Sequence, residues 1–193
     1  MPTDAEWVDR LASGDEQALA AIYDRYQGRI YRFAMQMTGN TTLSQDVTQE
    51  VFLGLLRRPR AFDSRRGSLE SFLYGIARNQ VLKDRQRERR YAEICEGGSA
   101  AETIATDAFA EFHDGEQSRV IREVLLSLPP LYREVVVLCE LQGLSYAECA
   151  AVVEVPLGTI RSRLYHARRI LADKLSAVLA PSSKHGASSG RAR

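Results

Sequence analysis

Cysteine is scarce in this sequence, and its spacing excludes several classes of protein. The 193 residues include three cysteines, Cys95, Cys139 and Cys149, which form no C-x-x-C pair and make an odd count. A disulfide framework is therefore not expected, and a reducing compartment fits the sequence. Cys139 and Cys149 sit among apolar neighbours, where a free thiol usually packs into a core.

Long apolar runs and the common signatures of catalysis are also missing. No stretch approaches the roughly 20 apolar residues of a membrane span, and the acidic N-terminus is unlike a signal peptide. We therefore expect no membrane insertion and a cytoplasmic location. We find no nucleophile–base pair, no cluster with metal-ligand spacing and no phosphate-binding loop. The sequence thus argues against an enzyme and predicts no cofactor and no small-molecule substrate.

The formal net charge is only +1, but the charges are unevenly distributed. Residues 1–50 carry eight acids and four bases, and residues 93–118 carry seven acids and no base. In contrast, residues 78–91 carry six bases against two acids, and residues 157–174 carry five bases against one acid. Two basic blocks on either side of an acidic connector indicate two surfaces for nucleic acid, joined by a segment that avoids it.

Helical periodicity dominates the chain, and no strand-like alternation is present. A long helix is expected from Asp15 to the stop signal around Gly39, a second from about Leu43 to Pro59, and a third from Ser68 to Arg90. We therefore predict an all-α protein with two small domains, an N-terminal helical bundle and a C-terminal helix-turn-helix domain. The predicted segments are the bundle (1–92), a flexible acidic linker (93–118), the second domain (119–180) and a disordered tail (181–193).

The clearest functional pattern lies between residues 144 and 171. Ser145 and Glu148 have the spacing of a capping box, and Pro156 then breaks the chain before a new helix. Ile160 and Leu164 begin an apolar face at helical spacing, so basic and hydroxyl side chains must point away from the core. This pattern is typical of a helix-turn-helix motif, in which the outer face of the second helix suits the major groove of DNA. The alternative is a helical hairpin whose arginines are only solvated. The predicted DNA-facing residues are Thr159, Arg161, Ser162, Arg163, Tyr165, His166 and Arg169.

Three stretches in this order resemble one known family. Residues 45–52 read QDVTQEVF, residues 72–79 read FLYGIARN, and residues 157–164 read LGTIRSRL. Together they resemble the extracytoplasmic-function (group 4) sigma factors of the sigma-70 family, over about residues 15–92 and 119–178. The resemblance implies binding to core RNA polymerase and to promoter DNA, −35 recognition by the C-terminal domain, and control by an anti-sigma factor.

The resemblance also implies roles for two surfaces of the N-terminal domain. The family's second helix docks on a coiled coil of the polymerase, although an amphipathic helix with a solvated outer side is the plainer interpretation. The loop 59–67 and the helix after it would hold melted −10 DNA, with Asn79 contacting a base; here the plainer interpretation is a solvated basic helix end. The implied polymerase-binding residues are Asp46, Gln49, Glu50, Phe52 and Leu53. The implied −10 residues are Arg60, Arg65, Arg66, Arg78, Asn79, Lys83, Arg85 and Arg87.

Two other functions remain open from the residues alone. A stand-alone helix-turn-helix regulator would bind a symmetric operator without polymerase. An adaptor that acts only through protein contacts would not need the basic residues predicted to face DNA. The family often has arginine at the position of His166, so a different −35 preference is open, and histidine could add a weak pH dependence. The loop 59–67 varies within the family, so the −10 preference cannot be carried over.

Overall fold

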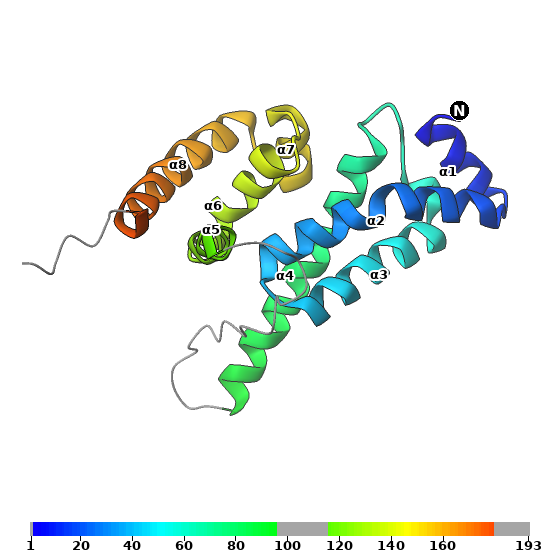
Figure 1. The fold of residues 1–193 in the computed structure, drawn as a ribbon. Helices are drawn as coiled ribbons and strands as arrows, with labels where there is room; N and C mark the ends of the chain where they lie inside the picture. Colours follow the sequence, from blue (N-terminus) through cyan, green and yellow to red (C-terminus); the bar gives the residue numbers. More distant parts are fainter. Residues whose placement is uncertain (1, 96–115, 180–193) are drawn as a thin grey trace, which may run out of the picture.

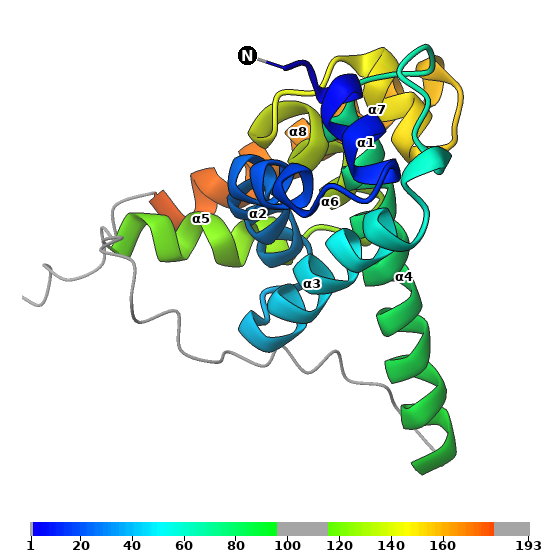
Figure 2. The ribbon, with the colours of Figure 1, turned by 90° about the vertical axis from the view of Figure 1, so that its right-hand side faces the viewer.

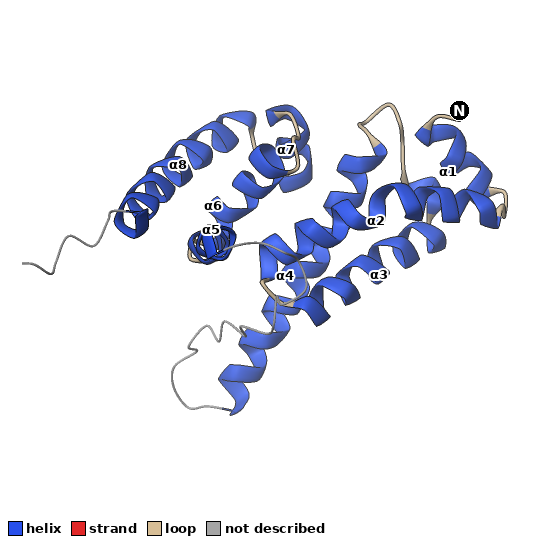
Figure 3. Ribbon diagram, viewed as in Figure 1, coloured by secondary structure: helices blue, strands red, loops and turns tan. Residues whose placement is uncertain are grey.

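The computed structural model describes residues 2–95 and 116–179, and side chains within them for 2–91 and 119–177. This part of the chain consists of helices and short connections without a strand, which confirms the all-α prediction (Figure 1, Figure 3). The predicted disordered tail lies outside the described residues, as does most of the predicted linker. In the described ranges, no helix is both long enough and apolar enough to cross a membrane.

The N-terminal domain is a bundle of four helices and one 3₁₀ turn. Helix α2 packs against α1, α3 and α4, so it lies at the centre of the bundle. Gly39 ends α2 in the left-handed conformation at φ 69°, and the Asn40 side chain then accepts the Leu43 N–H at 2.9 Å to begin α3. The elements are α1 (Asp4–Ala12), α2 (Glu16–Thr38), α3 (Thr41–Arg57), η1 (Pro59–Ala61) and α4 (Leu69–Cys95).

Helix α1 was not among the expected elements. Thr3 and Glu6 form a capping box at its start, and Val8 and Leu11 are buried on its inner side. Asp4 accepts a hydrogen bond of 2.6 Å from the Tyr26 hydroxyl, which fastens α1 to α2. The S/T-x-x-E spacing was readable, but one short helix carries too few apolar residues to give a periodic pattern.

The C-terminal domain contains four helices, with one π-helical turn. Leu128, Leu138, Ile160 and Leu164 are fully buried, so this domain has a dense apolar centre. Gly143, at φ 78°, follows the π turn in the left-handed conformation. The π turn itself, which continues α6, was not expected. The elements are α5 (Glu116–Leu126), α6 (Pro130–Val136), η2 (Val137–Leu141), α7 (Tyr146–Val153) and α8 (Leu157–Leu179).

The predicted linker overlaps the ends of two helices. Helix α4 continues to Cys95 and α5 begins at Glu116, so a few residues at each end of 93–118 are helical. The charged end of α4 extends away from the rest of the bundle (Figure 2).

The cysteines Cys139 and Cys149 follow the prediction, since Cys149 is buried and Cys139 is half-buried against the same core.

The two domains also pack against each other. Helix α4 contacts α7, while α2 contacts α5, α6 and η2. The described parts therefore form one body in which the C-terminal helices lie beside α2 and α4 (Figure 1). The sequence had suggested two tethered modules and gave no indication of this interface.

Candidate nucleic-acid interface

The helix-turn-helix is built as the sequence predicted. The Ser145 hydroxyl accepts the Glu148 N–H at 3.2 Å, and Glu148 Oε2 accepts the Ser145 N–H at 2.9 Å, so the capping box of α7 is complete. The Ser145 hydroxyl also lies 2.7 Å from Glu148 Oε2, and its hydrogen bond, together with that from the Ser145 N–H, holds the pKa of Glu148 below its ordinary value. Helix α7 ends at Glu154, a non-glycine residue at φ 60°, and α8 then begins at Leu157.

Helix α8 presents its apolar side to the domain and its polar side to solvent. Ile160, Leu164 and Ala167 are at most 1% exposed. Of the seven predicted DNA-facing residues, only Thr159 and Arg163 are half-buried. The expected orientation of the helix is therefore confirmed. The exposed members are Arg161, Ser162, Tyr165, His166 and Arg169.

Two further contacts define the edge of this surface. The His166 ring lies 5.5 Å from the Tyr165 ring and 6.2 Å from the Tyr132 ring, measured between centroids. Arg168 forms an ion pair with Glu140 of the π turn. Arg168 is not among the predicted DNA-facing residues, and its partner is 28 residues away in the sequence, so no local pattern indicates the pair.

The second basic surface combines the loop 59–67 with helix α4. Arg60, Arg65 and Arg66 are all exposed on the loop. The Arg65 side chain donates to Asp63 at 3.0 and 3.1 Å, and this hydrogen bonding lowers the pKa of the Asp63 carboxyl. The loop is thus held in shape by its own acid while its cationic groups face solvent.

The residues predicted on α4 do not share one environment. Asn79 and Lys83 are exposed, and Arg87 is exposed while lying 3.4 Å from Asp84. Arg85 is half-buried.

Arg78 differs from the expectation of an accessible cation. Its side chain is only 15% exposed and forms an ion pair with Glu134 of α6, whose side chain is 7% exposed. No sequence pattern indicates this contact, because Glu134 lies next to an apolar run in the other domain. Arg78 is therefore engaged within the chain in this structure.

The predicted polymerase-docking surface is mostly exposed along α3. Asp46 and Gln49 face solvent, while Glu50 and Leu53 are half-buried. Phe52 is a correction: it is 5% exposed, and its ring packs edge-on against Tyr23 at 4.8 Å. The phenyl ring belongs to the bundle core because its position on α3 faces α2.

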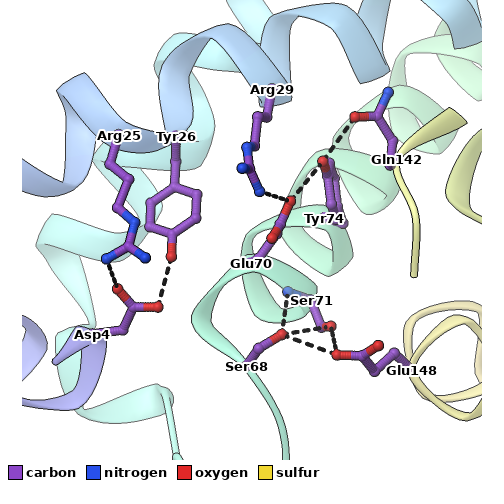
Figure 4. A network of polar contacts seen from close by, with 10 residues as sticks. All are labelled: Asp4, Arg25, Tyr26, Arg29, Ser68, Glu70, Ser71, Tyr74, Gln142 and Glu148. Carbon is purple, nitrogen blue, oxygen red and sulfur yellow. Dashed lines mark hydrogen bonds and ion pairs between the residues drawn. The ribbon is translucent and has the colours of Figure 1, made fainter. Parts of the chain in front are cut away.

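The interface between the domains contains a polar network, drawn in Figure 4. Glu148 Oε1 accepts hydrogen bonds from the hydroxyls of Ser68 and Ser71 at 3.3 and 3.4 Å. Ser68 also caps α4, as predicted, because its hydroxyl accepts the Ser71 N–H at 3.2 Å. One carboxylate of the C-terminal domain therefore lies at the N-terminus of α4, where the helix dipole favours an anion.

A second part of the network lies one turn further along α4. The Tyr74 hydroxyl lies 2.9 Å from Gln142 Oε1 and 3.2 Å from Glu70 Oε1. Gln142 in turn donates to Gln36 Oε1 at 2.7 Å, and Arg29 pairs with Glu70 at 2.7 Å. Burial raises the pKa of Tyr74, so its hydroxyl remains a hydrogen-bond donor.

The third part of the interface involves backbone groups at the end of α2. Arg133 donates to the Met37 carbonyl at 2.7 Å and to the Leu128 carbonyl at 3.0 Å. A Cβ atom on Gly39 would lie 2.7 Å from Leu126 Cδ1, so the C-terminal domain approaches α2 closely at this point. Polar and apolar contacts thus join the two domains.

Comparison with known families matches both domains. A model described as Sigma-70 region 2 matches residues 22–91, and one described as Sigma-70, region 4 matches residues 118–171. The ECF RNA polymerase sigma factor SigE of Mycolicibacterium smegmatis is 32% identical over 90% of this chain and 73% of its own length. SigW of Bacillus subtilis, also named an ECF sigma factor, is 30% identical over 87% of this chain and 94% of its own length.

Two solved structures are also similar to this chain. CnrH, in complex with the cytosolic domain of CnrY, is similar with a TM-score of 0.68 and 26% identity, covering 90% of this chain and 97% of that chain. RpoE of Bartonella quintana, in complex with the anti-sigma factor NepR, has a TM-score of 0.69 and 21% identity, covering 81% and 96%, and supports the fold. The chain belongs to the extracytoplasmic-function sigma factors of RNA polymerase, non-enzymatic proteins that direct promoter-specific transcription initiation.

Proposed function

We propose that this sigma factor reads the −35 element through the outer face of α8. The observation that carries the proposal is the division of α8 into a buried apolar side and an exposed polar side. Arg161 and Arg169 can donate to guanine edges or phosphates, and Ser162 can pair with several bases. Tyr165, which is 61% exposed, adds a flat apolar surface for thymine methyl groups.

The melted −10 element would lie along the loop 59–67 and helix α4. The three loop arginines supply charge for the phosphates of a single strand. Asn79 is exposed and both donates and accepts, which suits the edge of an unstacked base. Lys83, Arg85 and Arg87 continue the cationic path toward the end of α4, and Arg78 would join them once released from Glu134.

Helix α3 would dock on core polymerase. Asp46, Gln49 and Glu50 provide polar contacts, and half-buried Leu53 provides an apolar one. Leu56, three residues further along, is also exposed and extends the apolar part of this face. Phe52 is excluded from the proposed surface because it is buried.

Control by an anti-sigma factor and a cytoplasmic location complete the proposal. CnrH is related to this chain at 26% identity and was solved with a bound partner, the cytosolic domain of CnrY. A partner of this kind would cover the faces of α3 and α8 that polymerase and DNA require. Location in the cytoplasm follows from the place of RNA polymerase in bacteria.

A run-off transcription assay with purified core polymerase tests the proposed function. Promoter-specific transcripts should appear only when the chain is added. The Arg161→Ala variant should reduce initiation from promoters that depend on a −35 element. If the chain instead bound a symmetric operator tightly on its own and supported no initiation, it would be a stand-alone regulator.

A further inference from the structure

Two acidic side chains of the C-terminal domain occupy cationic sites on α4. Glu134 pairs with Arg78 in a contact where both side chains are largely buried, at 7% and 15% exposed. Glu148 lies at the N-terminus of α4, hydrogen-bonded to Ser68 and Ser71. Helix α4 therefore meets carboxylates at its N-terminus and about two to three turns further along.

These carboxylates resemble phosphate groups in the way they are held. An arginine side chain and a helix N-terminus are both common phosphate sites, because each directs N–H or O–H donors at an anion. Arg78 is one of the residues proposed to bind −10 DNA. While Glu134 accepts a hydrogen bond from Arg78 Nε, the Arg78 side chain is only 15% exposed, so little of it is accessible to a nucleic acid.

Neutral contacts hold the same closed arrangement. Gln142 bridges from the C-terminal domain to Gln36 at 2.7 Å and to Tyr74 at 2.9 Å. Leu126 packs over Gly39. These groups lie outside the proposed DNA-binding set, so they allow the closed arrangement to be weakened without altering that set.

We propose that the free chain masks its own −10 surface, with Glu134 and Glu148 occupying sites on α4 that DNA phosphates would otherwise take. The inference rests on the proposed role of α4 in −10 binding. Separation of the domains releases Arg78 and the N-terminus of α4 together. While the domains are together, the free sigma factor has a lower affinity for single-stranded promoter DNA, because Arg78 is paired with Glu134 and Glu148 occupies the N-terminus of α4.

The Glu134→Gln variant tests the masking directly. A neutral side chain cannot balance the buried Arg78 cation, so the closed arrangement loses its main ion pair. We expect a larger radius of gyration in small-angle X-ray scattering. We also expect roughly tenfold tighter binding of the free chain to a −10 non-template oligonucleotide, measured by fluorescence anisotropy.

Glu140→Gln is the matched control. It removes the same charge from an ion pair with Arg168 that lies wholly within the C-terminal domain and is exposed. Both properties should stay at the wild-type value in this variant. Equal gains in DNA affinity for the two variants would show a general charge effect and overturn the proposal.

Gln142→Ala provides a second route in case Glu134→Gln fails to fold. It removes only neutral contacts between the domains, so a smaller opening and about a twofold gain in oligonucleotide binding are expected. A folded variant that opens without any gain in DNA affinity would overturn the masking. A wild-type chain that is already extended in solution would also overturn the masking. Run-off transcription by wild-type chain and core polymerase is measured in parallel, and its absence would instead count against the proposed function.

Discussion

The basic faces of α8 and α4 have similar compositions but different surroundings. Tyr165 and Arg169 on α8 project into solvent, and nothing in the described part of the chain covers them. On α4, Arg78 is enclosed beside Glu134 of the other domain. A basic helix is therefore accessible to DNA when the remainder of its surface packs within its own domain, and less accessible when another domain covers part of it. Helix α8 meets that condition, whereas α4 shares one side with α6 and α7.

The largest effect expected from this comparison concerns the inner and outer sides of α8. Leu164 is 1% exposed and Tyr165 is 61% exposed, although they are adjacent. Leu164→Asp buries an unpaired carboxylate and should destabilise the C-terminal domain by more than about 4 kcal/mol. Tyr165→Asp should change the free energy of unfolding by only about 0.5 kcal/mol. Urea denaturation followed by circular dichroism measures both, and equal losses would contradict the orientation of α8.

The next effect separates DNA contact from charge. Arg161→Ala should weaken binding of the holoenzyme to a −35 duplex by about 1–3 kcal/mol, because a base-edge or phosphate contact is lost. Arg168→Ala is the control, since Arg168 is paired with Glu140 at the edge of the surface. Arg168→Ala should weaken binding to the −35 duplex clearly less than Arg161→Ala does. The melting temperature of the Arg161→Ala variant should equal that of the wild type, which shows that the loss is one of contact and not of folding. A greater loss for Arg168→Ala would move the −35 surface to the other side of α8.

A smaller effect compares two glycines with the same backbone conformation. Gly39 and Gly143 have φ values of 69° and 78°, so alanine is strained at both, by about 1 kcal/mol. Only at Gly39 does a new Cβ meet a neighbour, Leu126 Cδ1 at 2.7 Å. Gly39→Ala should therefore cost about 1 kcal/mol more than Gly143→Ala in urea denaturation. Identical costs would show that the domains are apart in solution.

The smallest expected effect is a pH dependence at Glu148. Its pKa in the folded chain lies below the ordinary value of 4.5, chiefly because of its hydrogen bonds with Ser145. The stabilisation it gives is complete above that ordinary value and is lost as pH falls through the lowered pKa. Glu148→Gln should remove the part of the loss of stability that begins as pH falls below about 4.5. A profile unchanged by the substitution would show that the carboxylate is not bound as described.

Local features of the fold were predictable, and contacts between distant segments were not. The stop at Gly39, the cap at Ser68 and the capping box at Ser145 each follow from a few neighbouring residues. The Arg78–Glu134 pair joins positions 56 residues apart, and no periodic pattern encodes such a contact. Phe52 was misplaced for a related reason, since a phenylalanine on α3 can serve a docking face or a core, and only the packing of Tyr23 decides between them.

The two oxygens of Glu148 serve different structures. Oε2 binds Ser145 within its own helix, while Oε1 reaches Ser68 and Ser71 in the other domain. Of the hydrogen bonds of Glu148, separation of the domains would therefore break only those of Oε1, which water can replace, and would leave the start of α7 capped. The first helix of the helix-turn-helix would thus keep its cap whether the domains are together or apart.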